Sequence, residues 1–244
     1  MLNIAHRGFR SRYPENTMLS FRKAVEAGCH GIEFDVHLSR DGVPVIIHDE
    51  TLERTTDGTG LVAEKNYAEL KKLNAVKPHP EAAAFEGIPS LREYFEYVSK
   101  LPGIISNIEL KTGIFVYEGI EAVVYRLMKE FDLTARCIVS SFNHESVMRM
   151  KALDPAVPCG LLVDSWQIHP EKYVRELGIE CYHPPAYCLN ASLVQALHNE
   201  NIKVNPWFGS IQGDYRQLIA MGVDSLITDY PDEISALLQA GSAV

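Results

Sequence analysis

The sequence lacks the features that mark thiolate metal sites, disulfide frameworks and membrane spans. Its 244 residues include only five cysteines, and no two of them form a Cys-x-x-Cys pair. An odd number of cysteines without metal-binding spacing predicts reduced, mostly buried thiols in a reducing compartment. No apolar run is long enough to span a bilayer, and no apolar leader precedes the opening MLNIAHRG. We therefore expect a cytoplasmic protein without stable membrane association, in which the sequon at Asn190 stays unused.

The chain also lacks an excess of positive charge. Acidic residues outnumber Lys plus Arg by 32 to 23, which gives a formal net charge of −9. Nucleic acids and anionic membrane surfaces are bound by basic faces, so neither is expected as the main partner. An anionic substrate would therefore need positive charge that is local or supplied by a metal ion. The hydrophobic and charged fractions, 46% and 23%, are typical of a compact globular protein.

Strand-like apolar segments alternate with helix-like segments along most of the chain. In residues 16–28, for example, apolar residues recur at helical intervals, with Asn16 as the expected N-cap and Gly28 as the stop. This alternation predicts βα units around a parallel sheet, and eight strands fit a closed TIM (β/α)8 barrel better than an open sheet. We expect a single domain over residues 1–244. The eight predicted strand segments are LNIAH, GIEFDVHL, GIISNIELK, RCIVSSF, PCGLLVD, IECYHP, IKVNPWF and SLITDYP.

One apolar segment, VPVIIHD, interrupts this alternation. It follows the second strand after only Asp41-Gly42, a pair that favours a tight two-residue hairpin turn. The second strand is therefore predicted to extend above the barrel mouth and double back. With Arg40 paired to Val43, His48 is expected to lie opposite Asp35.

The segment after this hairpin, at about residues 50–90, is rich in Gly and Pro. Only one short helix is expected in it, near Tyr67–Leu73. We predict that the segment is a small insertion lying over the barrel mouth.

Three acidic residues occupy the ends of two predicted strands. Glu33 and Asp35 are two residues apart, so they project to the same side of the second strand. Glu109 ends the next barrel strand, and functional groups in such barrels come from the carboxyl ends of strands. Three clustered carboxylates raise one another's pKa unless a cation compensates them, although water or arginine partners are an alternative. Oxygen ligands without cysteine favour Mg²⁺ or Ca²⁺ over zinc.

Two histidines and two cations belong to the same strand ends. His6 and His48 are candidate proton carriers because imidazole titrates near neutral pH, although each taken singly could be structural. Arg7 and Lys111 are expected to contact an anionic oxygen, Arg7 in the bidentate manner that suits phosphate. A local ion pair between Lys111 and Glu109 is an alternative.

The remaining aromatic and polar candidates are less constrained. Trp207 could lie in the core or form a wall for an apolar or glycerol-like group. A secondary pocket role stays open for His37 and His183. The other histidines are expected to be structural or at the surface: His30, His79, His144, His169 and His198.

Motifs along nearly the whole chain resemble the glycerophosphodiester phosphodiesterase family. They are AHRG at 5–8, PENT at 14–17, the run 31–60, and later IPSL, NIELK, SSF, NPW and ITDYP. The resemblance implies a TIM barrel with an insertion after strand two. It also implies hydrolysis of glycerophosphodiesters, which are deacylated phospholipids, to sn-glycerol 3-phosphate and an alcohol.

The same resemblance implies roles for the strand-end residues. Glu33, Asp35 and Glu109 become ligands of a divalent cation, Mg²⁺ or Ca²⁺. His6 and His48 become the acid–base pair, and Arg7 and Lys111 become phosphate contacts. The resemblance leaves open which histidine is the acid and whether a cyclic phosphate forms.

Three other functions remain as alternatives. Paired carboxylates at barrel strand ends also serve glycosidases, but the two histidines and the cations suit phosphate better than a neutral sugar. A lysophospholipase D-like phosphodiesterase is ranked lower because no amphipathic or basic stretch indicates membrane docking. A non-catalytic barrel that binds glycerophosphodiesters would have no need of both histidines.

Overall fold

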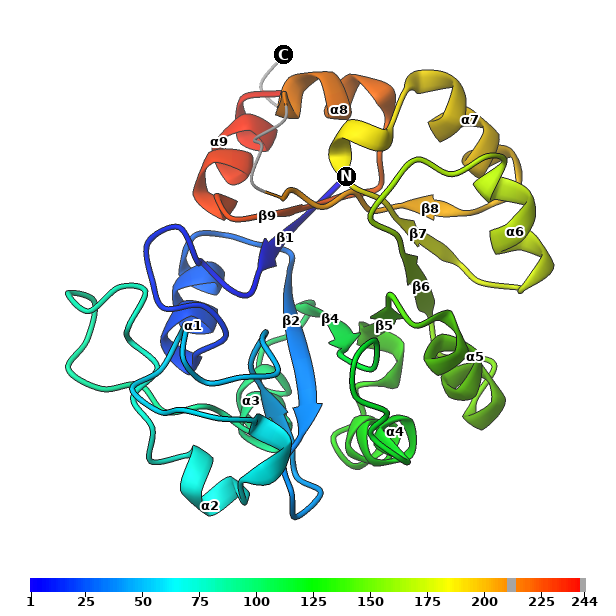
Figure 1. The fold of residues 1–244 in the computed structure, drawn as a ribbon. Coiled ribbons are helices and arrows are strands. Elements are labelled where there is room, and N and C mark those ends of the chain that lie inside the picture. Colours follow the sequence, from blue (N-terminus) through cyan, green and yellow to red (C-terminus); the bar gives the residue numbers. More distant parts are fainter. Residues whose placement is uncertain (210–213, 242–244) are drawn as a thin grey trace.

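Eight parallel strands form a nearly closed barrel, so the predicted TIM-barrel architecture is confirmed (Figure 1). The computed structural model describes residues 1–209 and 214–241. Neighbouring strands follow the order β8-β7-β6-β5-β4-β2-β1-β9. Between β8 and β9, the Asp224 and Ile227 amides donate to the carbonyls of Val204 and Pro206, each at 2.9 Å. The strands are β1 (Leu2–His6), β2 (Gly31–Leu38), β4 (Ile105–Leu110), β5 (Cys137–Ser141), β6 (Cys159–Leu162), β7 (Cys181–His183), β8 (Lys203–Val204) and β9 (Ser225–Thr228).

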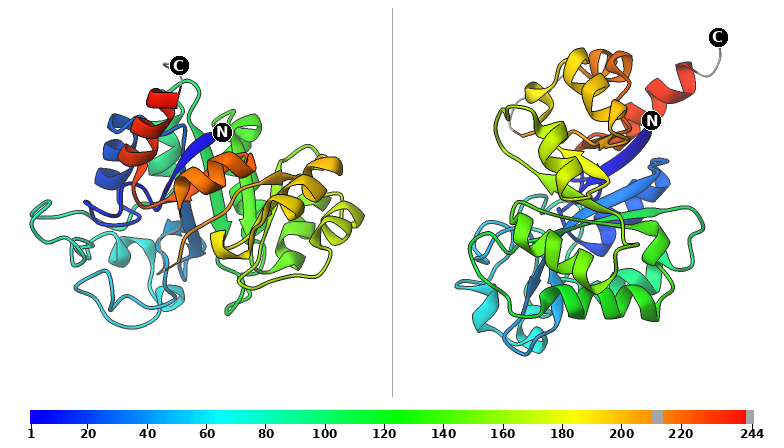
Figure 2. Two further views of the ribbon diagram at one scale, coloured as in Figure 1. Left: turned by 90° about the horizontal axis from the view of Figure 1, so that it is seen from above. Right: turned by 90° about the vertical axis from the view of Figure 1, so that its right-hand side faces the viewer.

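Helices cover the outside of the barrel (Figure 2). Strand β2 shows why, since Phe34 faces outward and packs against Phe21 and Tyr94, with ring centroids 5.9 and 4.4 Å away. Its neighbours Glu33 and Asp35 face the barrel interior, because successive side chains alternate between the two faces of a strand. The covering helices are α1 (Met18–Glu26), α3 (Leu91–Val98), α4 (Ile120–Glu130), α5 (His144–Leu153), α6 (Pro170–Glu176), α7 (Ala191–Asn199), α8 (Tyr215–Met221) and α9 (Pro231–Gly241).

Helix α1 begins one residue later than predicted. Thr17 is the N-cap, because its side chain accepts a hydrogen bond from the Ser20 amide at 3.2 Å. The prediction of Asn16 as the N-cap was wrong. Asn16 has a φ of 56° and donates from Nδ2 to Asp35 Oδ2 at 2.9 Å. The predicted stop at Gly28 lies just after the C-cap, with a φ of 80°.

The hairpin after β2 is present, but its register differs from the predicted one. Strand β3 (Pro44–Ile46) runs antiparallel to β2, and Leu38 pairs with Pro44. The loop has three residues, because the Ser39 amide donates to the Val43 carbonyl at 3.0 Å and Gly42 adopts a φ of 76°. A left-handed residue at the third position is the usual geometry of such loops.

This register corrects the predicted position of His48. Ile47, not His48, lies opposite Asp35, and its amide donates to the Asp35 carbonyl at 3.1 Å. His48 nevertheless lies near the acidic residues of β2. Strand β3 ends at Ile46, so the alternation of side chains between the two faces of the strand does not extend to His48. The His37 ring fixes this bend, with Nε2 3.0 Å from the His48 carbonyl oxygen.

Residues 50–90 contain little regular structure. The predicted short helix is α2 (Tyr67–Leu70), and a 3₁₀ turn, η1 (Val62–Glu64), precedes it. The segment packs against β3 around its own hydrophobic cluster, which is separate from the main core. That residues 1–244 form a single domain with this insertion stays a prediction. The cluster consists of Val45, Ile47, Leu52, Val62, Leu70, Ala75 and Ile88.

All five cysteines are buried and free of disulfides. Within residues 1–209 and 214–241, no helix combines the length and apolar character needed to cross a membrane. The cytoplasmic location stays a prediction.

Candidate active site

A cavity of about 600 Å³ opens at the carboxyl ends of the barrel strands. Because the strands are parallel, side chains at the ends of β1, β2, β4 and β9 meet there. The segment after β3 adds two charged residues to its wall. The polar and charged residues that line the cavity are His6, Arg7, Arg10, Glu33, His48, Asp49, Arg54, Asn107, Glu109, Ser140, Asp229 and Tyr230.

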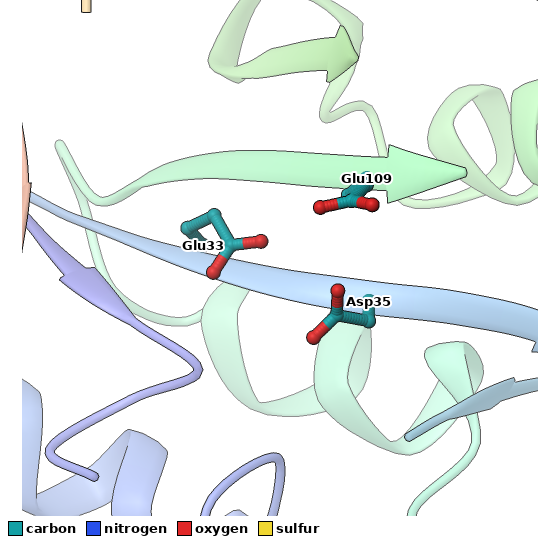
Figure 3. A group of neighbouring side chains, drawn as sticks. All are labelled: Glu33, Asp35 and Glu109. Atoms are coloured by element: carbon teal, nitrogen blue, oxygen red, sulfur yellow. The ribbon is translucent and has the colours of Figure 1, made fainter. Parts of the chain in front are cut away.

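Three carboxylates lie close together on β2 and β4 (Figure 3), and two of them, Glu33 and Glu109, line the cavity. Glu33 and Asp35 come from β2, and the register places Asp35 directly beside Glu109 of β4. One oxygen atom from each residue lies within 4.8 Å of the other two. All three side chains are buried. The predicted cluster is therefore present in space, and its donors are the hard oxygen atoms that Mg²⁺ and Ca²⁺ prefer.

The charge of this cluster is only partly compensated by the protein. Burial raises the pKa of Glu33 well above its usual value, and the charges of Asp35 and Glu109 add to the shift. Burial also raises the pKa of Glu109 to about 7, although Lys111 opposes the rise. Burial acts in the same direction on Asp35, but Arg7 and other cations keep its pKa low. Asp35 Oδ1 is buried without a hydrogen-bond partner. A cation with free coordination positions would satisfy this oxygen and offset the charge.

His6 lies at the end of β1 with its ring held between two acids. Its Nδ1 is 2.6 Å from Asp229 Oδ1, and its Nε2 is 3.9 Å from Glu33 Oε2. The contact with Asp229 favours a proton on Nδ1, which leaves Nε2 directed at the carboxylate cluster. Burial lowers the pKa of His6.

His48 has the same arrangement on the other side of the cluster. Its Nδ1 is 2.5 Å from Asp49 Oδ1, and its Nε2 is 3.4 Å from the Lys111 ammonium. Burial lowers the pKa of His48 as well. Each predicted proton carrier thus binds a carboxylate through Nδ1 and presents Nε2 to the site.

The two predicted phosphate-binding cations also lie at the cluster. Lys111 Nζ is 2.9 Å from Glu109 Oε1 and 3.6 Å from Asp35 Oδ1, so the alternative of an ion pair with Glu109 is realised in this state. The Arg7 amide donates to Glu33 Oε2 at 3.0 Å, and its Nη1 donates to Glu15 Oε1 at 2.9 Å. Its backbone adopts a left-handed φ of 55° to make these contacts.

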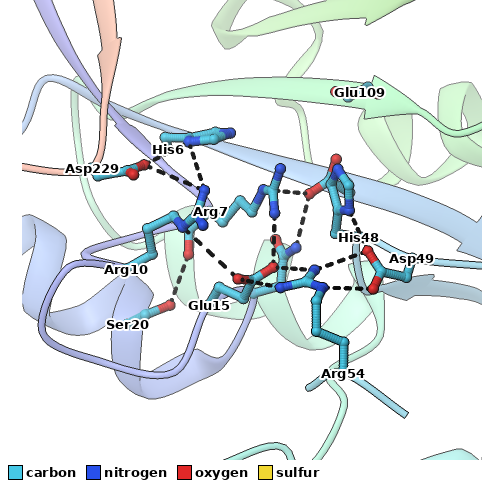
Figure 4. Close-up of polar contacts among 12 residues, drawn as sticks. His6, Arg7, Arg10, Glu15, Ser20, His48, Asp49, Arg54, Glu109 and Asp229 are labelled. Carbon is cyan, nitrogen blue, oxygen red and sulfur yellow. Dashed lines mark hydrogen bonds and ion pairs between the residues drawn. The ribbon is translucent and has the colours of Figure 1, made fainter. Parts of the chain in front are cut away.

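A network of arginines and acids, which the sequence analysis missed, supports the histidines (Figure 4). Glu15 is buried and forms ion pairs with Arg7, Arg10 and Arg54. Arg54 donates two hydrogen bonds to Glu15, at 2.8 and 2.9 Å, and two to Asp49, at 2.6 and 2.9 Å. The PENT motif, which contains Glu15, was the available signal. Asp229 was visible only as an acid at a strand end.

Trp207 lines the cavity, which corresponds to the second of its two predicted positions, the wall of a pocket. Its Nε1 donates to the His183 carbonyl at 3.1 Å, and its ring lies 6.0 Å from that of Phe142. Neither of the two histidines left open lines the cavity. His37 holds the His48 backbone, and His183 is buried deeper in the barrel, where its ring leaves no room for a Cβ on Gly160.

Comparisons with known proteins identify the family. The family model described as "Glycerophosphoryl diester phosphodiesterase family" matches residues 6–233. Glycerophosphodiester phosphodiesterases from Caldanaerobacter subterraneus and Bacillus altitudinis are 38% and 36% identical to the chain, covering 98% and 94% of both chains. An Oleispira antarctica phosphodiesterase, solved with its product sn-glycerol-3-phosphate, superposes with a TM-score of 0.88 at 32% identity. That superposition covers 98% of this chain and 97% of the other. The chain is an enzyme of the glycerophosphoryl diester phosphodiesterase family.

Proposed function

We propose that this protein hydrolyses small glycerophosphodiesters to sn-glycerol 3-phosphate and an alcohol, using a divalent cation and two histidines. The activities in the names of its relatives support the reaction, and so does the product in the Oleispira antarctica complex. The observation that carries the proposal is geometric. Three buried carboxylates lie together, His6 directs Nε2 toward Glu33 at 3.9 Å, and His48 directs Nε2 toward Lys111, the cation that contacts the other two acids.

Glu33, Asp35 and Glu109 are the residues that would hold the cation, either Mg²⁺ or Ca²⁺. The raised pKa values of Glu33 and Glu109 fit a site that is completed by a positive ion, and so does Asp35 Oδ1, which accepts no hydrogen bond. When bound, such an ion polarises a phosphate oxygen and offsets the charge of the diester. Arg7 and Lys111 would contact the remaining phosphate oxygens and stabilise the negative charge that develops on them.

His6 and His48 would move the two protons of the reaction. One Nε2 accepts the proton of the attacking hydroxyl group as its oxygen bonds to phosphorus. The other Nε2, when protonated, donates to the alcohol oxygen as its bond to phosphorus breaks. Asp229 and Asp49 hold the two rings through Nδ1, so that each Nε2 keeps its direction.

The first test is the removal of each imidazole. We expect His6→Ala and His48→Ala each to lower kcat on glycerophosphocholine by about 10²- to 10⁴-fold, the range for a lost acid–base group. Circular dichroism and thermal melting should stay near those of the wild type. His169→Asn is a matched control, because His169 is exposed and its left-handed φ of 52° suits asparagine. Wild-type turnover in both alanine variants would contradict the acid–base assignment.

The second test addresses the cation by binding as well as by activity. Titration calorimetry of the chelator-treated enzyme should detect binding of Mg²⁺ or Ca²⁺, and Glu109→Gln should weaken it strongly. Chelation should abolish choline release, and the cation that binds should restore it. Glu96→Gln, on the exposed face of α3, is the matched control. Full activity after chelation, with no binding heat, would contradict metal dependence.

The non-catalytic alternative predicts a different outcome for the same assays. A binding barrel would bind glycerophosphocholine in the presence of the cation without releasing choline. Release of glycerol 3-phosphate at catalytic turnover would contradict it.

A further inference from the structure

A second cavity, of about 420 Å³, lies at the amino ends of the barrel strands, opposite the active site. We call it the lower cavity. Its volume is within the range of about 300–1,000 Å³ that ligand pockets occupy. Asn107 and Ile227 line both cavities, so the lower one begins at the floor of the active site. Its wall includes the first residues of six strands, which are Leu2, Ile105, Cys137, Cys181, Lys203 and Ser225.

The inner part of the lower cavity is lined by His183, which has an unused hydrogen-bond donor. Ser225 Oγ donates to Asn205 Oδ1 at 2.8 Å, and Asn205 Nδ2 lies 3.0 Å from His183 Nε2. The amide therefore donates to Nε2, and the proton of the neutral ring is on Nδ1. Burial keeps the ring neutral, because it lowers the pKa of His183 to about 3. Nδ1 is buried and has no partner within residues 1–209 and 214–241, so its proton needs an acceptor.

Asn107 adds a second donor at the boundary between the two cavities. Its Oδ1 accepts a hydrogen bond from Ser140 Oγ at 3.4 Å, whereas its Nδ2 donates to no group in the described part of the chain. Both unused donors require oxygen acceptors. An ionised group would be costly to bury at this depth, so the inner end suits an uncharged oxygen such as that of a hydroxyl group.

The mouth of the lower cavity carries two cations without acidic partners. Arg136 and Lys203 line it, and neither forms an ion pair with any residue that the structure describes. The two acids in the wall are already engaged. Glu180 pairs with Lys151, and Asp224 Oδ2 accepts hydrogen bonds from a backbone amide and a histidine. The mouth therefore suits an anionic group, and an arginine beside a lysine suits phosphate.

We propose that the lower cavity binds a small organic phosphate, with its phosphate group at Arg136 and Lys203 and an uncharged oxygen at His183 Nδ1. Apolar side chains between the two ends, among them Ile4 and Ile138, would contact the carbon atoms of the ligand. Phosphate monoesters of polyols have this chemistry, and sn-glycerol 3-phosphate is a suitable probe. The site is separate from the active site and does not depend on the function proposed there.

Variants at the mouth separate binding in the lower cavity from binding of the same probe in the active site. Arg136→Gln/Lys203→Gln should raise the Kd of the lower cavity about tenfold, since each exposed ion pair contributes a factor of about three. Ala135→Trp should block this binding, because Ala135 is exposed and lines the mouth. Choline release from glycerophosphocholine should stay unchanged in both variants. Lys65→Gln/Lys72→Gln, in the insertion, is the control with the same loss of charge.

Three probes, compared by titration calorimetry, test the two ends of the site. Relative to sn-glycerol 3-phosphate, propyl phosphate lacks the hydroxyl groups and glycerol lacks the phosphate. We expect propyl phosphate to bind the lower cavity about fivefold more weakly for each hydrogen bond lost. Glycerol should bind more weakly than either phosphate, because it has no group for the two cations. The NMR signal of the His183 Nδ1 proton should shift with sn-glycerol 3-phosphate and not with propyl phosphate.

The contrary outcomes are distinct. Binding of sn-glycerol 3-phosphate that neither mouth variant weakens would place the probe in the active site alone and overturn the proposal. No binding of either phosphate would overturn it as well and assign the lower cavity to water. Equal affinities of the two phosphates would overturn the role of His183. A wild type that releases no choline contradicts the proposed function only, because binding in the lower cavity is measured without turnover.

Discussion

At the scale of single residues, the most consequential contacts are those that hold the two imidazoles. His6 Nδ1 binds Asp229 at 2.6 Å, and Asp49, the partner of His48, is itself fixed by two hydrogen bonds from Arg54. Arg54 also binds the buried Glu15, so it connects the segment after β3 to the loop after β1. The orientation of His48 therefore depends on a guanidinium that is 43% exposed at the cavity wall.

This dependence predicts the behaviour of Arg54→Ala. We expect kcat to fall about 10- to 100-fold, the usual effect of removing a partner that orients a functional group. KM should change little if Arg54 acts by positioning and not by contacting substrate. Millimolar guanidinium should restore part of the lost kcat, because the cation can enter the exposed position. Steady-state kinetics with guanidinium, and with sodium chloride at equal ionic strength, would measure this.

Arg40→Ala removes an exposed arginine that pairs with Asn66 and Glu69 on the far side of the same segment. It should leave kcat unchanged and insensitive to guanidinium. A large rise in KM for Arg54→Ala, with kcat retained, would instead make Arg54 a substrate contact.

At the scale of elements, the hairpin of β2 and β3 sets the position of His48. Its three-residue loop depends on Gly42, whose φ of 76° is unfavourable for residues with a Cβ atom. A Cβ at this position would meet no atom within 4 Å, so backbone conformation alone disfavours a substitution.

Gly42→Ala should therefore lower the free energy of unfolding by about 1 kcal/mol, the strain of a left-handed alanine. Urea denaturation would measure it. Gly113→Ala is a matched control, because Gly113 also has open space around its Cα but does not adopt a positive φ. This control should be neutral or slightly stabilising, since alanine restricts the unfolded chain. Equal losses in both variants would contradict the argument from φ.

At the scale of the whole molecule, the acidic cluster links the stability of the fold to pH and, through the proposed metal site, to a divalent cation. Burial raises the pKa of Glu109 to about 7, whereas an unfolded glutamate titrates near 4.5. Between these pH values the folded protein holds a proton that the unfolded chain has released. The contribution of Glu109 is therefore fully present below about pH 4.5 and is lost as pH rises through about 7.

In the presence of a chelator, the wild type should consequently lose stability between pH 5 and pH 8. Over the same pH range the loss of stability in Glu109→Gln should be smaller than that in the wild type, by at most about 3 kcal/mol, because glutamine carries no charge at either pH. Urea unfolding of both proteins at the two pH values would measure the difference. Saturating Mg²⁺ or Ca²⁺ at pH 8 should stabilise the wild type, since a ligand that binds only the folded state raises its stability. An identical pH dependence in the two proteins would contradict the assigned shift.

Sequence periodicity and local motifs determined much of this protein. Eight apolar strand segments separated by helical patterns were enough to predict the barrel, because hydrophobic burial and βα alternation leave few other architectures. The spacing of Glu33 and Asp35, together with Glu109 at the next strand end, placed three acids at one point, since parallel strands end at the same edge. The local motifs, such as AHRG and PENT, were enough to indicate the family.

Only the tertiary structure decided the contacts between segments that are distant along the chain. The register of the β2–β3 hairpin depended on the conformation of Gly42, which Asp41-Gly42 alone left compatible with two loop lengths. Asn16 looked like a helix cap, but the fold turns it toward Asp35. The partners Asp229 and Arg54 lie 223 positions from His6 and 39 from Glu15. Such contacts depend on how the loops pack, and local patterns do not encode that packing.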